Sequence, residues 1–183
     1  MAWTKKALDI GAEGIILPRV RSVEEVQELV SNCRYPPEGT RGYGPHRASE
    51  YGRLMGPDYQ PFANRCVFTA AQIEDTAAVA ALDQILAVPG LDSLVLGPND
   101  LAGSMGYPGQ PEHPAVLAAI TEICVRAREA GIPVGSGLGP SHEFAMELIG
   151  RGVTWLQCGG DYGYLLAGLE SFYGELRRRV TGA

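Results

Sequence analysis

Two acidic residues follow apolar stretches that are typical of buried strands. Glu74 comes after VFTAAQI, and Asp100 comes after LDSLVL and a Gly97–Pro98 turn. Two neighbouring carboxylates repel each other unless a cation lies between them, and hard oxygen ligands favour Mg²⁺ or Mn²⁺. The pair therefore indicates a divalent-metal site, provided that the fold brings both stretches to one edge.

Helix capping is the alternative explanation for acidic residues at these positions. An Asp or Asn that follows a strand often caps the next helix, and Asp75 or Thr76 could do so for a helix over residues 76–87. For Asp100 alone, capping and metal binding are equally compatible with the sequence. Its pairing with Glu74, and the small residues around both, favour the metal site.

The elements that must position these residues alternate in type along the chain. We predict strands at residues 14–20, 67–74, 91–98, 132–138 and 153–160. We predict helices over residues 23–34, 76–90, 113–131, 141–152 and 164–180, the first with a capping box formed by Ser22 and Glu25. Apolar strands that alternate with amphipathic helices predict a parallel sheet covered by helices.

The expected fold class is α/β, with about five βα units in this chain. The repeat suits a (β/α) TIM-type barrel, apparently incomplete, and it also suits a doubly wound sheet. Both folds bind ligands at the carboxyl ends of the strands. Because Glu74 and Asp100 end successive units, neighbouring parallel strands would place them at the same edge.

Composition limits the other classes of function. The chain has 183 residues and is 45% hydrophobic, which is enough for one domain over residues 1–183. A net charge of −6 argues against nucleic-acid binding. Apolar runs fall short of the roughly 18–20 residues that cross a bilayer. The cysteines are scattered, without a CxxC pair, so we expect reduced thiols, a cytoplasmic location and no zinc site.

Two further features bear on chemistry. Residues 35–53 form the least regular stretch, and long loops in compact domains are often functional. Lys5 and Lys6 are the only lysines, and both lie in a helix-like opening segment. A Schiff-base mechanism through a lysine at a strand end is therefore excluded.

Several stretches, in order, resemble one known family. The chain is similar to the HpcH/HpaI aldolases, which are class II pyruvate aldolases related to citrate lyase. The resemblance lies in LDIGAEGIILPRV, RYPPEGTRGYGPHRAS, QIED, GPNDLAGSMGY and QCGGD, which together cover almost the whole chain. QIE and GPxDL at this spacing are a more specific signal than either motif alone.

The resemblance implies a set of site residues at the ends of the central strands. Glu74 and Asp100 would bind a divalent cation, Mg²⁺ or Mn²⁺, with Co²⁺ possible. Gln72 would contact a bound keto acid, namely pyruvate. The backbone of Gly97, Pro98 and Asn99 would approach the keto-acid carboxylate, and Leu138 would line the pocket.

Two more residues match positions of the family that act in catalysis. Asp9 falls where the family has an aspartate that reaches a neighbouring subunit's site, which implies a homo-oligomer. Arg47 falls near an arginine at the opening through which the aldehyde reaches the site. The alternatives are that Asp9 faces solvent near a helix end, and that Arg47 pairs with Glu50.

The chain also departs from the family pattern. In the family, three strand units precede the LDIGA segment, and they carry a histidine for proton transfer and an arginine that steadies the enolate. No residue here matches either one. Three hypotheses follow: a metal-dependent aldolase for 4-hydroxy-2-oxo acids acting through a pyruvate enolate, a truncated barrel that binds metal and keto acid but turns over poorly, and an interaction protein that pairs through open sheet edges.

Overall fold

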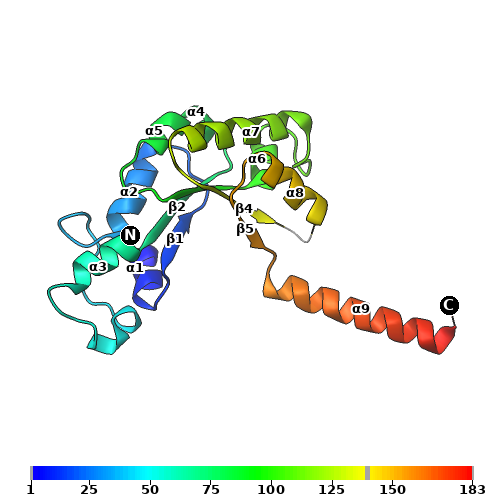
Figure 1. The fold of residues 1–183 in the computed structure, drawn as a ribbon, viewed down its shortest axis with the longest axis horizontal. Coiled ribbons are helices and arrows are strands. Elements are labelled where there is room, and N and C mark those ends of the chain that lie inside the picture. Colours follow the sequence, from blue (N-terminus) through cyan, green and yellow to red (C-terminus); the bar gives the residue numbers. More distant parts are fainter. Residues whose placement is uncertain (1, 139–140, 183) are drawn as a thin grey trace.

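The computed structural model contains one sheet of five parallel strands (Figure 1). It describes residues 2–138 and 141–182, apart from the side chains of Ala2 and Leu138. The strands are β1 (Gly14–Leu17), β2 (Phe68–Ile73), β3 (Ser93–Leu96), β4 (Val134–Leu138) and β5 (Trp155–Cys158). All four neighbouring pairs are parallel, as the sequence predicted.

The order of the strands decides between the two expected folds. It is β1-β2-β3-β4-β5, the same as the order along the chain. A doubly wound sheet would reverse direction at a switch point, whereas successive right-handed crossovers in one direction place the helices on one face. The chain is therefore a curved, incomplete (β/α) barrel, and Figure 1 shows α2, α4, α5 and α7 on the same side of the sheet.

The helices agree with the predicted pattern and add several short elements. They are α1 (Ala2–Asp9), α2 (Val23–Cys33), the 3₁₀ helix η1 (Arg47–Gly52), α3 (Tyr59–Cys66), α4 (Thr76–Ala80), α5 (Leu82–Leu86), α6 (Pro98–Ser104), α7 (Pro114–Glu129), α8 (His142–Gly150) and α9 (Asp161–Thr181). The predicted helix over 76–90 is two helices, because the chain leaves helical geometry at Ala81 (φ −92°, ψ 9°). The Gly97–Pro98 turn opens into α6, which the sequence analysis missed.

The predicted strand over residues 14–20 is shorter in the structure. β1 ends at Leu17, since Pro18 has no N–H to donate to the sheet. Arg19 then adopts a left-handed conformation, with φ +56°.

The main core lies between the sheet and its helices. Ile73, Leu94 and Leu96 from the strands pack there with Leu82 and Ile120 from the helices, and all five are at most 1% exposed. This packing fixes β2 and β3, whose ends carry the two predicted metal ligands.

The opposite, concave face of the sheet is filled near its amino edge. The Trp155 ring lies 6.2 Å from that of Phe68 in edge geometry, and its Nε1 donates a hydrogen bond to Ser93 Oγ at 3.0 Å. Gly135 makes room for this ring, because a Cβ there would lie 2.1 Å from it. Gln72 lies nearer the carboxyl end of the same face, beside Val95 in the parallel register.

The irregular stretch predicted at residues 35–53 is largely a loop, apart from η1. It is fastened at one point to α3, where Asn64 Oδ1 accepts a hydrogen bond from the Tyr35 amide at 2.7 Å and Nδ2 donates one to the Tyr35 carbonyl at 3.0 Å. The start of the loop therefore has a defined place beside α3.

The last helix differs from the others in its surroundings. No residue of α9 is buried, and Figure 1 shows the helix extending away from the sheet. Within the described part of the chain, no helix combines the length and apolarity needed to cross a membrane.

All four cysteines are unpaired, as predicted. Burial raises the pKa of the Cys33 and Cys124 thiols to about 11, so both stay protonated at neutral pH.

Candidate functional site

The structure brings the ends of β2 and β3 together at one edge of the sheet. Gln72 pairs with Val95 and Ile73 with Leu96 in the parallel register. The Gly97 amide then donates to the Ile73 carbonyl at 3.4 Å. Glu74 and the Gly97–Asp100 segment therefore leave the sheet side by side, as the strand pattern suggested.

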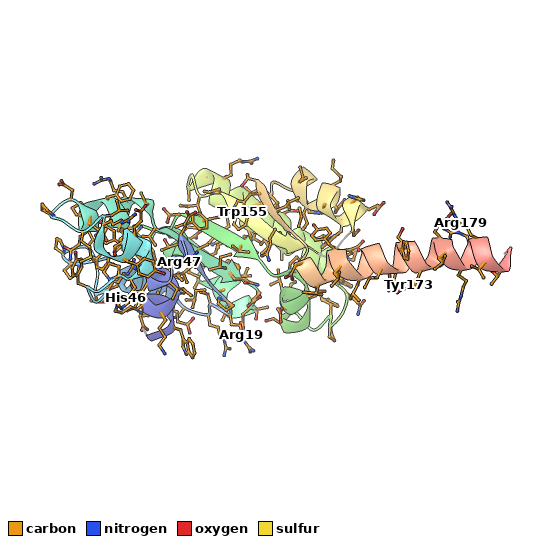
Figure 2. The ribbon with its side chains drawn as sticks, turned by 90° about the horizontal axis from the view of Figure 1, so that it is seen from below. Arg19, His46, Arg47, Trp155, Tyr173 and Arg179 are labelled. Carbon is orange, nitrogen blue, oxygen red and sulfur yellow. The ribbon has the colours of Figure 1, made fainter. Side chains whose placement is uncertain are left out.

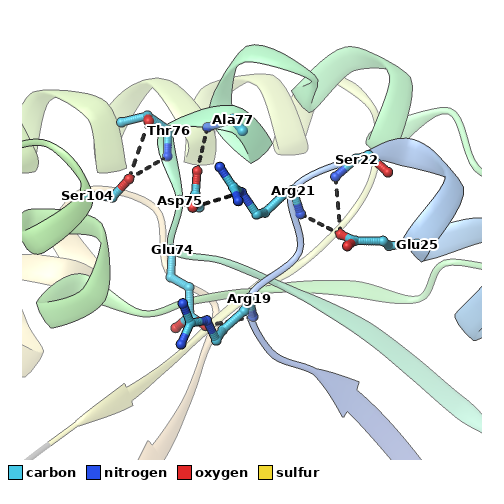
Figure 3. Close-up of polar contacts among 9 residues, drawn as sticks. All are labelled: Arg19, Arg21, Ser22, Glu25, Glu74, Asp75, Thr76, Ala77 and Ser104. Carbon is cyan, nitrogen blue, oxygen red and sulfur yellow. Dashed lines mark hydrogen bonds and ion pairs between the residues drawn. The ribbon is translucent and has the colours of Figure 1, made fainter.

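Glu74 is buried, and both of its carboxylate oxygens accept a hydrogen bond. Its side chain is only 5% exposed. Oε1 accepts from the Arg19 amide at 2.7 Å (Figure 3), and Oε2 accepts from Gln72 Nε2 at 2.6 Å. A carboxylate offers about four acceptor positions, so each oxygen keeps a lone pair that could face a cation.

Gly97 is required by the packing at this edge. A Cβ on Gly97 would lie 2.3 Å from Glu74 Oε2 and 2.9 Å from Gln72 Nε2. Neither side chain can move away freely, because the Gln72 amide and the Glu74 carboxylate are hydrogen-bonded to each other. The glycine lets the backbone of the β3–α6 turn approach the Glu74 carboxylate closely.

Asp100 lies in the first turn of α6 and is exposed. The residue at the cap position of this helix is Gly97, and no side chain caps it. Within residues 2–138 and 141–182, Asp100 forms no ion pair. Capping, the alternative weighed for Asp100, is therefore not its role, and its carboxylate faces solvent near Glu74's edge of the sheet.

The capping role belongs instead to Asp75. Its Oδ1 accepts from the Ala77 amide at 2.8 Å, at the start of α4, and its Oδ2 lies 3.2 Å from Arg21 Nε (Figure 3). Ser104 Oγ accepts from the Thr76 amide at 2.9 Å, which ties α4 to α6. These bonds turn Asp75 toward the helices and leave Glu74 on the other side.

As predicted metal ligands, the two carboxylates would form a sparse set. Among the described residues, no three His, Cys, Asp or Glu side chains gather closely enough to hold a metal ion. Mg²⁺ commonly binds through one or two carboxylates and keeps several waters. A buried, oriented Glu74 and an exposed Asp100 fit that kind of site, and a Zn²⁺ site would need more protein ligands.

Asp9 lies at the other edge of the sheet. It is the last residue of α1, ahead of β1, and is 9% exposed. Its carboxylate accepts from Arg41 Nη2 at 2.9 Å and pairs with Lys5 Nζ. The alternative that Asp9 simply faces solvent is thus wrong, because the carboxylate is buried against two cations.

Arg47 lies near Asp9 and not near Glu74. It is exposed in η1 and lines a cavity of about 590 Å³ together with Leu8, Arg41 and Tyr59. The same cavity is lined by residues 11–13 and 66–67, which precede β1 and β2. Figure 2 shows Arg47 and His46 away from Arg19. In the described residues, Arg47 does not pair with Glu50.

Leu138 is the last residue of β4, where its backbone pairs with Cys158 of β5. Its side chain lies outside the described residues.

Sequence reasoning missed Arg19 and Arg41. Arg41 is buried, with its guanidinium carbon 4.6 Å from the centre of the Tyr35 ring. Arg19 contacts Glu74 through its backbone, which a side-chain pattern cannot reveal. The only signal in the sequence was the proline before Arg19, which marks the end of the strand.

Comparison with known proteins identifies the family. The sequence profile of the HpcH/HpaI aldolase/citrate lyase family matches residues 1–167. The chain belongs to this family. A solved HpcH/HpaI aldolase/citrate lyase family protein from Burkholderia cenocepacia superposes with a TM-score of 0.87 at 30% identity, over 97% of this chain and 70% of that one.

Two curated relatives are named as aldolases. A 2-dehydro-3,6-dideoxy-6-sulfogluconate aldolase from Pseudomonas putida is 36% identical over 176 residues, which is 96% of this chain and 68% of the relative. A pyruvate aldolase from Rhizobium etli is 39% identical over 168 residues, 91% of this chain and 65% of the relative. The chain thus spans about two thirds of the length of these relatives, and the family supports an aldolase or related lyase in general.

Proposed function

We propose that this chain carries the metal- and keto-acid-binding part of a class II pyruvate aldolase, which cleaves or forms 4-hydroxy-2-oxo acids through a pyruvate enolate. The observation that carries the proposal is Glu74, a buried carboxylate held on both oxygens at the carboxyl edge of the sheet. Burying a carboxylate is costly unless it is well bonded or paired with a cation. Family membership and the aldolase names of the relatives support the same activity.

In this proposal Glu74 and Asp100 hold a divalent cation, Mg²⁺ or Mn²⁺. When bound, such an ion supplies Lewis-acid stabilisation of an enolate oxygen. Gln72 fixes Glu74 through its amide and lies on the concave face, where a keto acid would bind. The backbone of Gly97, Pro98 and Asn99 lies beside Glu74 and would approach the carboxylate of pyruvate.

Asp9 and Arg47 take a different part in the proposal. Both lie near the amino edge of the sheet, on the side away from Glu74. They cannot act at the Glu74 site of the same chain in this arrangement, so a role toward the aldehyde requires a neighbouring subunit. The lysines of this chain lie away from Glu74: Lys5 pairs with Asp9 at that same edge, and Lys6 Nζ lies over the Trp3 ring.

Titration with Mn²⁺ tests the metal site directly. We expect Glu74→Gln and Asp100→Asn each to weaken Mn²⁺ binding by at least about a hundredfold, since each removes one of two charged ligands. Asp58→Asn, an exposed change ahead of α3, is the control and should bind as the wild type does. The fold should persist, and loss of one repelling charge can stabilise the metal-free protein. Equal affinity in the wild type and Asp100→Asn would reject the metal site.

Exchange of the pyruvate methyl protons in D₂O, followed by NMR, tests the chemistry. We expect exchange that depends on Mn²⁺ or Mg²⁺, because a bound divalent cation would stabilise the enolate oxygen. Binding of Mn²⁺ and pyruvate without exchange would instead support a weakly catalytic barrel.

A further inference from the structure

One row of concave-face residues crosses the sheet at the level of Glu74. The register fixes the preceding row, in which each residue pairs with the next: Gln72, Val95, Gly135 and Trp155. Side chains two positions apart on a strand point to the same face, so the next row on this face lies two residues further along each strand. That row consists of Glu74, Gly97, Gly137 and Gln157.

Contacts on this face show that the side chains of Glu74 and Gln157 both point into it. A Cβ on Gly97 would lie 2.3 Å from Glu74 Oε2. A Cβ on Gly137 would lie 3.9 Å from Gln157 Oε1. Trp155, two residues before Gln157 on the same strand, packs on this face as well. Glu74 and Gln157 therefore border the same strip of the concave face, with two glycines between them.

Gly137 differs from the neighbouring glycines in what its missing side chain leaves open. Gly97 and Gly135 are each required by packing, because a Cβ at either would lie within 2.3 Å of a neighbouring side chain. At Gly137 the contact with Gln157 is an ordinary van der Waals distance, and apart from its chain neighbours no other described residue would lie within 4 Å. Its φ is not in the left-handed region either. The space beside Gly137 is therefore open to a ligand.

The side-chain amide of Gln157 is available to such a ligand. The side chain is exposed. Among the described residues, the side-chain hydrogen bonds of β5 involve Trp155 Nε1 and the Cys158 carbonyl, so the fold does not use this amide. An amide group both donates and accepts hydrogen bonds, as a hydroxyl group does. Gln157 is thus suited to bind an uncharged hydroxyl.

The place of Gln157 in the row indicates which part of a substrate it meets. In the proposed function, the keto acid lies between Gln72, a cation on Glu74 and the turn that follows β3. β4 and β5 come after β3 in the sheet. Neighbouring strands lie about 4.8 Å apart, which places the Gln157 backbone roughly 10 Å from that of Gly97. The part of the substrate that the aldehyde contributes can extend from the keto acid over Gly137 to Gln157.

We propose that Gly137 and Gln157 bind the part of the substrate that comes from the aldehyde. Gly137 leaves room for the carbon chain, and the Gln157 amide hydrogen-bonds to an uncharged hydroxyl at its end. Gln157 is a specificity-determining residue in this inference, which rests on the proposed function and adds two residues to the same site.

Calorimetric binding of oxamate derivatives to the Mn²⁺-loaded protein tests the inference without turnover. Oxamate is an unreactive analogue of pyruvate, and a substituent on its nitrogen takes the place of the aldehyde-derived chain. N-(2-hydroxyethyl)oxamate and N-propyloxamate have the same number of non-hydrogen atoms and differ in a terminal hydroxyl against a methyl group. The wild type should bind the hydroxyethyl compound about threefold to tenfold more tightly, as one hydrogen bond provides.

Two variants separate the hydrogen bond from the open space. Gln157→Ala should bind the two N-substituted compounds equally and keep wild-type affinity for oxamate itself. Gly137→Ala places a methyl group in the open space, so both N-substituted compounds should bind severalfold more weakly while oxamate binds as before. The fold should persist in Gly137→Ala, because the new methyl group would contact Gln157 at an ordinary distance.

Each variant has a matched control. Gln84→Ala removes an exposed glutamine of α5. Gly150→Ala adds a methyl group at the end of α8, where a Cβ would meet no described atom within 4 Å. Neither control should change the affinity for any of the three compounds.

The outcomes distinguish this inference from the proposed function. A wild-type protein that binds neither Mn²⁺ nor oxamate rejects both. A wild type that binds oxamate but does not prefer the hydroxyethyl compound, or a Gln157→Ala variant that keeps the preference, rejects only the role of Gln157. A Gln157→Ala variant that loses affinity for oxamate to the same degree places Gln157 at the keto acid and overturns the inference. Wild-type binding of both N-substituted compounds by Gly137→Ala rejects the role of the open space.

Discussion

Glu74 and Asp100 contribute to the proposed site in unequal ways. Glu74 is buried and held by the Arg19 amide and the Gln72 side chain, whereas Asp100 is exposed on the first turn of α6. One proposed ligand is therefore held in place by the protein itself, and the other is exposed. Because Gly97 has no side chain, the turn that leads to Asp100 can lie close to the Glu74 carboxylate.

Gly97→Ala should damage the site more than the fold. The added methyl would lie 2.3 Å from Glu74 Oε2, so the carboxylate must move, and we expect Mn²⁺ affinity to fall at least about tenfold. Overpacking of this kind costs about 1–3 kcal/mol in the free energy of unfolding. Calorimetric titration and urea denaturation measure the two effects.

Gly103→Ala is the matched control for that substitution. Gly103 lies in α6, the helix that begins directly after Gly97, and a Cβ there would meet no atom within 4 Å. Replacing a helical glycine by alanine should raise stability by about 0.5–1 kcal/mol and leave Mn²⁺ binding unchanged. Wild-type Mn²⁺ affinity in Gly97→Ala would show that the close contact has no role in the site.

At the scale of elements, neighbouring acidic residues at the end of β2 have separate tasks. Glu74 faces the carboxyl edge of the sheet, and Asp75 caps α4 and pairs with Arg21. The cap fixes where the chain turns from strand to helix, and so it fixes the direction in which Glu74 leaves the sheet.

Asp75→Ala should lower stability and spare the metal. Loss of a helix cap costs about 1 kcal/mol, and the partly exposed pair with Arg21 adds little. We expect a lower urea midpoint and wild-type Mn²⁺ affinity, the reverse of the result for Glu74→Gln. An Asp75→Ala protein that loses Mn²⁺ binding while remaining folded would mean that Asp75 is a ligand.

At the scale of the whole molecule, α9 exposes apolar residues that no other element in the described part of the chain buries. Six of its apolar residues recur every three or four positions and are 44% to 76% exposed: Tyr162, Leu165, Leu169, Phe172, Leu176 and Val180. This spacing is that of a seam between two helices. An antiparallel pair of α9 helices would bring the arginines at 177–179 of each copy near Asp161 of the other.

We therefore expect a homo-oligomer in which a second copy covers α9. Leu169→Asp places a charge in the middle of the seam and should shift the protein toward monomer in sedimentation velocity at micromolar concentration. Ser171→Asp adds the same charge off the seam and should leave the assembly intact. A wild-type protein that sediments as a monomer at high micromolar concentration would contradict this expectation.

The local pattern of the sequence was sufficient for the parallel α/β architecture and for the candidate ligands. Alternating strands and helices require a parallel sheet, and the side chains that follow the strands must meet at its carboxyl edge, so Glu74 and Asp100 could be singled out from residue types and spacing. A cap at Asp75 or Thr76 could also be predicted from the sequence, because capping depends on only three or four adjacent residues.

Only the tertiary structure decided the remaining features, because they depend on long-range contacts. The strand order, which distinguishes a barrel from a doubly wound sheet, follows from how each helix packs back on the sheet. Asp9 and Arg47 lie at the opposite edge from Glu74 because they precede strands and do not follow them. The contact between Arg19 and Glu74 joins residues 55 positions apart through a backbone amide. Every residue type except proline has this N–H donor, so the side-chain pattern could not predict the contact.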